Sequence, residues 1–224
     1  MKSVSTQPPR ALQELEAATM IVVPDLLRAT FSASIDSASG RQGLAALERA
    51  GATLSSAVRA TLPAATVQFQ EFRLRQVSKL KSRGDDTLQP TITGRIDLPL
   101  APELSFWGRA RLVTALCAIT ESASAEAQRA KPRITVSFGQ PTALVADPES
   151  HRRALISQWL ERIRSFSAQA STSGICSALR LQSCSLPGAV SQHPRSVLEV
   201  ALKLDISPSG PLEAFHEPPS DPST

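Results

Sequence analysis

The chain has 224 residues, of which 24 are Lys or Arg and 20 are Asp or Glu, so its formal net charge is +4 at pH 7. A chain of this length buries a core without a metal ion or disulfide framework. Its 42% hydrophobic and 20% charged residues are typical of a globular protein. Aromatic residues make up 4% and include no tyrosine, which argues against base stacking and phenol chemistry. The charge falls short of the dense basic arms of an obligate nucleic-acid binder.

The three cysteines, Cys117, Cys176 and Cys184, cannot all pair with one another, so we expect a reducing compartment and no disulfide framework. Their spacing fits no zinc pattern, and we predict no metal and no cofactor. The N-terminal segment lacks the apolar run of a secretory signal, and no stretch reaches the roughly 18 apolar residues of a membrane span. We therefore expect a cytoplasmic protein without a membrane span. A periplasmic or envelope location would need a different translation start.

The first elements follow a polar N-terminal tail, residues 1–18, which we expect to be disordered or partly helical. Apolar residues alternate with polar ones over 27–35, which predicts a strand with one dry and one wet face. Over 37–62 the apolar residues recur every three or four positions, which predicts an amphipathic helix.

A second strand is predicted at 65–77. Over 65–74 its apolar residues follow one another at every second position except between Phe69 and Phe72, which are three residues apart. Such a break in the alternation needs one extra residue in the strand, so we expect a β-bulge near Gln70 and Glu71.

The middle of the chain continues the alternation of strands and helices. Strand periodicity returns over 91–100 and 134–138, with a long amphipathic helix over 103–129 between them. A third helix is predicted to open at Asp147, an N-cap residue followed by Pro148.

Two strands are expected to close the domain, at 179–182 and 199–206, joined by a loop over 185–196. Every predicted strand alternates, whereas a parallel sheet covered on both faces would have continuous apolar strands. The sequence therefore predicts a two-layer α+β fold, βαββαβ followed by αββ, with a mainly antiparallel sheet and helices packed on one face. The first six elements match the split βαβ, ferredoxin-like order. The Pro-rich tail, 208–224, is expected to be disordered.

Several segments together resemble one known family. Pro24 and Asp25 lead into the alternating strand ATFSASID and an Ala-rich helix that begins near Gly40. Residues 136–170 follow the strand-to-helix pattern F-x-x-x-D/P followed by spaced alanines, and the chain ends with the strand SVLEVALKLDI. In this combination the chain resembles the SIMPL domain family, named for a signalling molecule that associates with a pelle-like kinase. The resemblance covers about residues 20–206.

The resemblance implies a compact α+β domain, here residues 19–207, in a family whose bacterial members are often exported to the cell envelope. Some members are linked to oxidative-stress tolerance, and some assemble into higher oligomers. The family brings no established catalytic residues, so we carry none over. It implies a homo-oligomer or a protein partner.

A basic segment is the strongest candidate binding site in the sequence. It comprises the second strand and the loop after it, with the side chains Arg73, Arg75, Lys79, Lys81 and Arg83. Such a surface attracts nucleic acid, anionic lipid or acidic protein. The wet strand faces carry no aromatic side chain for base stacking, so nucleic acid is the less favoured partner, and charges that protect a sheet edge from aggregation are the simpler explanation.

Other candidates are weaker. The histidines, His151, His193 and His216, form no metal-ligand or catalytic spacing. Gly40 and Gly43 match a G-x-x-G clamp, but a strand precedes them where such a clamp joins two helices.

Three functions follow from these observations. The first is a non-enzymatic SIMPL-like module that oligomerises or binds a partner in stress or envelope physiology. The second is a basic module that binds nucleic acid or anionic surfaces through Arg73 to Arg83. The third is a thiol redox protein that uses Cys176 or Cys184, with Arg180 near enough to lower a thiol pKa.

Overall fold

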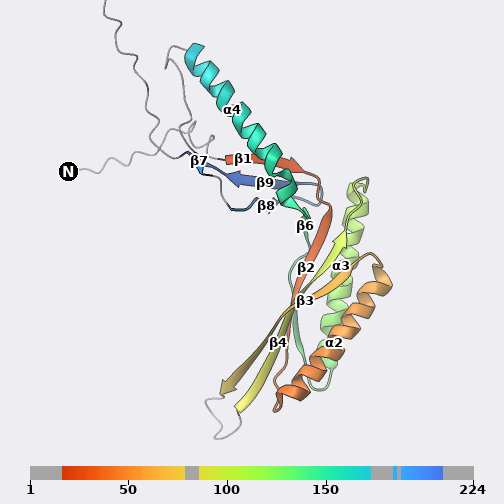
Figure 1. Cartoon of the computed structure of the whole chain (residues 1–224). Helices are drawn as coiled ribbons and strands as arrows, with labels where there is room; N and C mark the ends of the chain where they lie inside the picture. Colours follow the sequence, from red (N-terminus) through yellow and green to blue (C-terminus); the bar gives the residue numbers. More distant parts are fainter. Residues whose placement is uncertain (1–16, 79–85, 173–183, 186–187, 209–224) are drawn as a thin grey trace, which may run out of the picture. The chain divides into compact units, whose positions relative to one another are not determined.

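The computed structural model describes residues 17–78, 86–172, 184–185 and 188–208 (Figure 1). The chain forms two compact units. Unit 1 contains Met1–Val22, Asp147–His193 and Ala201–Thr224, and unit 2 contains Val23–Ala146 and Pro194–Val200. Both predicted tails, apart from their inner ends, lie outside the described residues, as does the predicted strand at 179–182.

Unit 2 is built on an antiparallel sheet. Its strands β2 (Leu26–Ser34), β3 (Thr66–Ser78), β4 (Asp86–Pro99) and β5 (Thr135–Phe138) lie in the order β3-β4-β2-β5. This is the predicted split order, in which the first and third strands are central. A further short strand, β6 (Thr142–Leu144), pairs with β2 beside β5. The predicted α+β class is confirmed.

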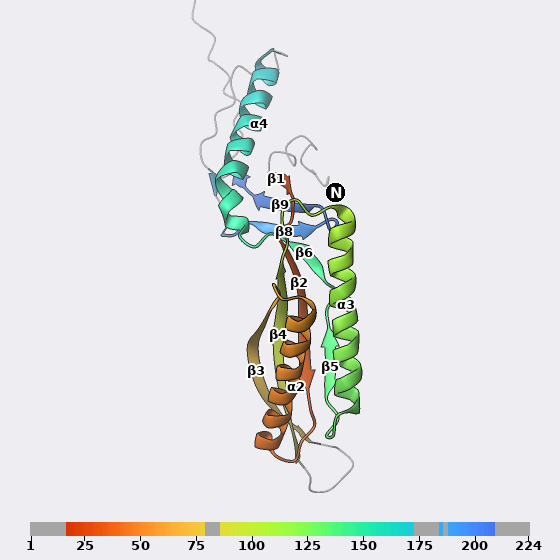
Figure 2. The same cartoon turned by 90° about the vertical axis from the view of Figure 1, so that its right-hand side faces the viewer.

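Two helices cover one face of this sheet, as the two views show (Figures 1 and 2). They are α2 (Gly40–Thr61) and α3 (Phe106–Arg129). The core lies between the helices and the sheet, where the cross-strand pairs Leu27–Leu98 and Ala29–Ile96 meet Leu54, Val58 and Leu116. Each of the larger side chains contributes about 1.5–3 kcal/mol by leaving water.

The register of β3 against β4 shifts between Phe69 and Glu71. The predicted bulge is therefore present at the predicted place. It lets Phe69 and Phe72 lie on the same, helix-facing side of the sheet although they are three residues apart.

A close approach at the centre of the sheet requires glycine at position 94. A Cβ atom there would lie 2.4 Å from the Phe31 ring and 2.5 Å from the Gln68 carbonyl oxygen. The ring of Phe31 occupies this space and meets Phe69 edge-on, with centroids 5.8 Å apart.

Unit 1 holds a separate sheet in the order β1-β9-β8, formed by β1 (Ala17–Val22), β9 (Val200–Asp205) and β8 (Ser191–Pro194). The sequence predicted one mainly antiparallel sheet, whereas β8 and β9 pair with β1 in a sheet of their own. Both Ala201 and Leu202 of β9 are buried, so this central strand is covered on both faces. The alternation of residues within a strand does not tell which sheet that strand joins. The four residues of β8 lie within the segment that was predicted to be a loop.

The helical part of unit 1 begins as predicted at Asp147, whose carboxylate accepts a hydrogen bond from the Ser150 N–H at 3.3 Å. A 3₁₀ turn, η1 (Pro148–His151), precedes α4 (Arg152–Thr172). Leu155 and Trp159 of α4 are buried. Two short strands, β7 (Cys184–Ser185) and β10 (Ser207–Pro208), pair with each other.

Candidate functional site

The edge strand β3 exposes a row of large apolar side chains. Phe69, Phe72 and Leu74 are 52%, 50% and 50% exposed, although they share the helix-facing side of the sheet. They project from the outermost strand, where β4 covers only one flank. An unpaired edge with exposed apolar residues is a surface that natural proteins normally protect.

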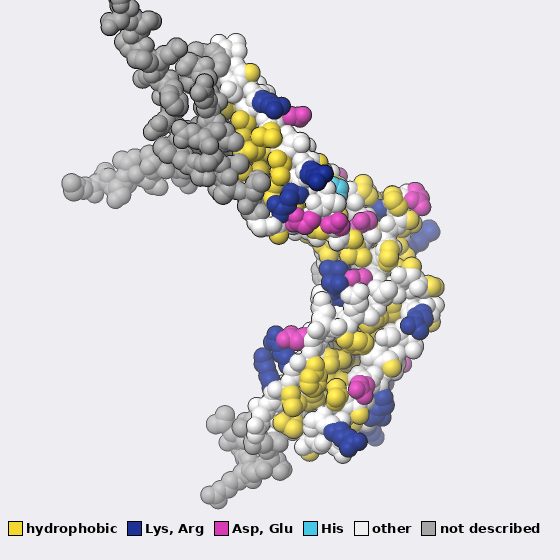
Figure 3. Space-filling view, in the orientation of Figure 1, with side chains coloured by type: hydrophobic (Ala, Val, Ile, Leu, Met, Phe, Trp, Pro, Cys, Tyr) yellow, Lys and Arg dark blue, Asp and Glu magenta, His cyan; other side chains and the backbone are white. Residues whose placement is uncertain are grey.

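A groove runs between this strand and α2. It has a volume of about 520 Å³. Its apolar lining comes from Leu44, Leu47 and Ala52 of α2 and from Phe69 and Phe72 of β3. Figure 3 shows hydrophobic side chains gathered between α2 and the edge of the sheet. The groove and the exposed row share Phe69 and Phe72, and we call the two together the β3 surface.

The basic segment begins on the same strand but on its other face. Arg73 and Arg75 are exposed there, while Lys79, Lys81 and Arg83 lie outside the described residues. The Arg73 Nε atom lies 2.6 Å from Glu71 Oε1, and this hydrogen bond, with the charge of Glu71, raises the pKa of the Arg73 guanidinium. Of the two described arginines of the basic segment, Arg73 is therefore paired with a carboxylate of the same strand.

The open face of the sheet carries a charged network that follows the strand register. Arg28 and Asp97 are cross-strand partners, joined by two hydrogen bonds of 2.7 and 2.9 Å. Arg95 lies 3.1 Å from the same carboxylate and also donates to Gln68 Oε1 at 2.8 and 3.0 Å. The hydrogen bonds that Arg28 donates to Asp97 are the main cause that raises the pKa of the Arg28 guanidinium, against a smaller effect of burial.

This network changes the interpretation of the wet face. Arg28 and Arg95 both lie on this face, where by themselves they would make it positive. Both arginines face Asp97 instead, so the centre of the face has a smaller net charge than the arginines alone would give. An anion at this face would compete with a carboxylate that is already held by two arginines.

A buried arginine is the main polar feature that sequence reasoning missed. Arg109 of α3 is 1% exposed, and its guanidinium donates to the backbone oxygens of Pro24 at 2.8 Å, Leu104 at 3.2 Å and Ala101 at 3.3 Å. It ties the start of α3 to the segment that precedes β2. The sequence held one signal that Arg109 is buried: it stands three residues before Leu112, on the same side of the predicted helix.

The remaining candidates carry little chemistry. Within the described ranges no group of three or more His, Cys, Asp or Glu side chains could hold a metal ion. Cys117 is half-buried on α3, and Cys176 lies outside the described residues. Gly43 packs in the first turn of α2, where a Cβ atom would lie 2.6 Å from Pro90 Cγ, so close packing explains this glycine.

None of the helices in the described part of the chain is both long and apolar enough to cross a membrane. No family model matches the chain, and no curated protein matches it.

Some solved structures show a distant similarity. A hydantoinase/carbamoylase family amidase from Burkholderia ambifaria is 15% identical, with a TM-score of 0.33 over 65% of this chain and 36% of that one. A hydantoinase/carbamoylase family amidase from Burkholderia vietnamiensis is 13% identical, with a TM-score of 0.34 over 65% and 35%. A hydrolase from Listeria innocua is 12% identical, with a TM-score of 0.18 over 84% and 91%. The chain thus spans about a third of the two amidases, and similarity at this level carries no argument about its function.

Proposed function

We propose that this chain is a non-enzymatic SIMPL-domain protein that works as an oligomerising module, with a second copy of the chain on the β3 surface. The single observation that carries the proposal is the edge strand β3, thirteen residues long, with Phe69, Phe72 and Leu74 half-exposed beside an apolar groove. The resemblance to the family adds an expected role in stress or cell-envelope physiology.

Strand addition is the mode of contact that such an edge favours. A second strand satisfies the outward-facing N–H and C=O groups of β3, while alternate side chains fill neighbouring apolar surface. The sequence of β3 is also complementary to itself. In an antiparallel pair centred on Phe72, the two Phe72 rings meet on one face, and Glu71 of each copy lies opposite Arg73 of the other. Opposite charges across a strand pair stabilise it, whereas like charges would oppose it.

Light scattering after gel filtration, on the full chain in moderate and then high salt, tests this assembly. We expect a multimer in both conditions, because backbone pairing and apolar burial do not depend on salt as exposed ion pairs do. Phe72→Lys places a charge at the centre of the pair and should give a monomer. A monomeric wild-type chain in both salts would overturn the proposal.

The matched control is Trp107→Lys. Trp107 is 70% exposed on α3 of the same unit, so this variant introduces the same charge at an apolar position away from β3. We expect it to keep the wild-type mass. Dissociation by Trp107→Lys but not by Phe72→Lys would contradict the β3 surface as the interface.

A basic binding module is the second candidate. The observation in its favour is Arg75, an exposed cation on β3 for which the described residues supply no ion-pair partner. Binding of nucleic acid or anionic vesicles through Arg73 to Arg83 would weaken steeply between about 50 and 200 mM salt. Salt-independent assembly and salt-dependent binding distinguish the two candidates.

A further inference from the structure

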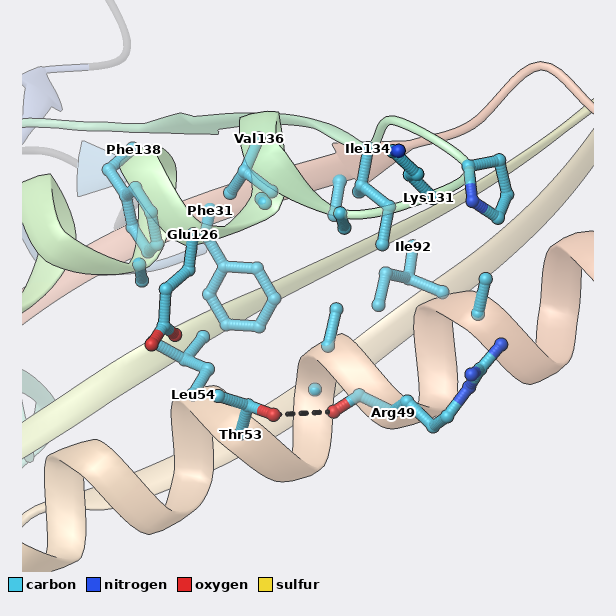
Figure 4. A pocket seen from close by; sticks show the side chains of 18 residues that line it. Phe31, Arg49, Thr53, Leu54, Ile92, Glu126, Lys131, Ile134, Val136 and Phe138 are labelled. Carbon is cyan, nitrogen blue, oxygen red and sulfur yellow. Dashed lines mark hydrogen bonds between the residues drawn. The ribbon is translucent and has the colours of Figure 1, made fainter.

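A second hollow lies on the other side of α2, between α2 and α3, above the helix-facing side of the sheet (Figure 4). Its volume is about 200 Å³. The sheet side contributes large side chains, among them Ile92 of β4, Val136 of β5 and Ile134 just before β5. The helices contribute small ones such as Ala50 and Ala127. Because the alanines end at Cβ, the helices do not fill the space over the strands, and the interior of the hollow is apolar.

The charged residues of this cleft are unevenly distributed. Figure 4 shows Arg49 of α2 and Lys131 at one end and the Glu126 carboxylate at the other, beside Phe31. Arg49 Nε donates to the Ala45 carbonyl oxygen of its own helix at 3.2 Å. Among the described residues neither Arg49 nor Lys131 has a carboxylate within ion-pair distance. Two cations without a counter-charge therefore stand at one end of an apolar cleft.

Thr53 also lines the cleft but is not a candidate donor. Its hydroxyl donates to the Arg49 backbone oxygen at 3.0 Å, the bond drawn in Figure 4. The polar recognition elements are thus the cationic end and the anionic end alone.

We propose that this cleft binds a small monocarboxylic acid with an apolar body. The carboxylate lies against Arg49 and Lys131, because hydrogen bonds between ionised partners are the strong ones. The apolar body lies over Ile92 and Val136. A cavity of about 150 Å³ holds benzene, so this cleft takes a body of about six to eight carbon atoms. Glu126 repels a second carboxylate at the far end, which selects monoacids against diacids of the same length. The proposal does not rest on assembly through β3.

Calorimetric titration of the full chain with octanoate tests the site. We expect saturable binding with a Kd at or below about 1 mM, which is ordinary for a ligand of ten heavy atoms. Octanedioate has the same length with a second carboxylate, and 1-octanol has the same body without the charge. Each should bind at least about tenfold more weakly than octanoate. Octanedioate brings a second carboxylate toward Glu126, and 1-octanol offers Arg49 and Lys131 no charge. Equal affinity for all three, or no saturable binding of octanoate, would overturn the proposal.

Variants locate the binding. The pair Arg49→Gln with Lys131→Gln changes two exposed side chains and should weaken octanoate binding about tenfold or more. Arg59→Gln removes another exposed arginine, in the last turn of α2 and outside the cleft, and should leave the affinity unchanged. Ala50→Leu fills the cleft and should abolish binding, with circular dichroism to verify the fold. If the double glutamine variant binds as tightly as wild type, octanoate binds elsewhere and the assignment is wrong.

Discussion

At the scale of single residues, Asp97 is the side chain on which the open sheet face depends. Its carboxylate is 12% exposed and faces Arg28 and Arg95, which are 28% and 30% exposed. Asp97→Asn removes the negative charge and leaves the two arginines beside an amide. We expect a loss of about 1–3 kcal/mol in the free energy of unfolding, because bonds to charged groups are worth more than neutral ones and both cations lose their partner. Urea denaturation at pH 7 measures it.

The control for Asp97 is an exposed ion pair away from β3. Asp205 and Lys203 lie 2.7 Å apart, but their side chains are 61% and 40% exposed. Asp205→Asn should therefore change the free energy of unfolding much less than Asp97→Asn does. If both variants lost a similar amount of free energy of unfolding, the burial of Asp97 would not strengthen its ion pairs with Arg28 and Arg95.

The sequence allowed some of these residue positions to be predicted and not others. Alternation in β2 and β4 was enough to place Arg28 and Asp97 on the wet face. It could not pair them, because the pairing depends on a register between strands 69 residues apart in the chain. Arg109 escaped because a helical stripe was read from its apolar members only, whereas a buried guanidinium needs backbone oxygens that other segments supply.

At the scale of elements, long periodic segments were predictable and short ones were not. The strands β2 and β3 and the helices α2 and α3 match their predicted ranges to within a few residues, whereas β4 begins at Asp86, ahead of its predicted start at 91. The β3 bulge follows from the alternation of its apolar residues alone. The strands β6 and β8 are three and four residues long, too short for a period to show. Arg73 and Arg75 lie on β3 as predicted. The exposure of the apolar face of β3 was not predicted, because strand order is not a local property.

The junction between η1 and β8 gives unit 1 a pH dependence. Glu149 Oε2 accepts from Arg152 Nε at 2.7 Å, and its Oε1 accepts from the Val190 N–H at 2.7 Å. The bond from Arg152 and then the bond from Val190 lower the pKa of the Glu149 carboxyl below its ordinary value. Because the pKa of Glu149 is lower in the folded chain than in the unfolded chain, its ionised carboxylate stabilises the fold at pH values above the unfolded pKa of about 4.3. This stabilisation is lost as the pH falls through the pKa of Glu149 in the folded chain.

Glu149→Gln removes that titration. We expect the urea midpoint of the wild-type chain to fall more than that of Glu149→Gln as the pH is lowered from 6 to 3, so the difference between the two narrows. The control is Asp205→Asn, which breaks an exposed pair with Lys203 in the same unit and leaves the Glu149 contacts in place. This control should retain the wild-type pH dependence. A constant difference between wild type and Glu149→Gln across the range would refute the assignment.

At the scale of the whole molecule, the chain forms two compact units where the sequence predicted one domain. Hydrophobic patterning identifies which residues are buried but not which of them share a core. Leu202 and Ile96 are both fully buried members of alternating strands, yet they belong to the sheets of unit 1 and unit 2 respectively. The segments of unit 1 come from both ends of the chain, so its core depends on contacts that no local pattern encodes.

The two tryptophans provide a way to follow the units separately. Trp159 is 2% exposed on α4 of unit 1, which packs on β1, while Trp107 of unit 2 is 70% exposed. In a Trp107→Phe background, emission from Trp159 reports unit 1. Leu202→Ala and Ile96→Ala each truncate a fully buried side chain, which costs about 2–5 kcal/mol.

We expect Leu202→Ala to lower the urea midpoint seen by Trp159 emission, and Ile96→Ala to leave that midpoint nearer to the background value. Circular dichroism, which reports helices of both units, should register both substitutions. The physical reason is that truncating a buried side chain destabilises the core to which that side chain belongs. Equal shifts of the Trp159 midpoint by both variants would mean that the units unfold as one cooperative body, since two-state behaviour would then join both cores in a single transition.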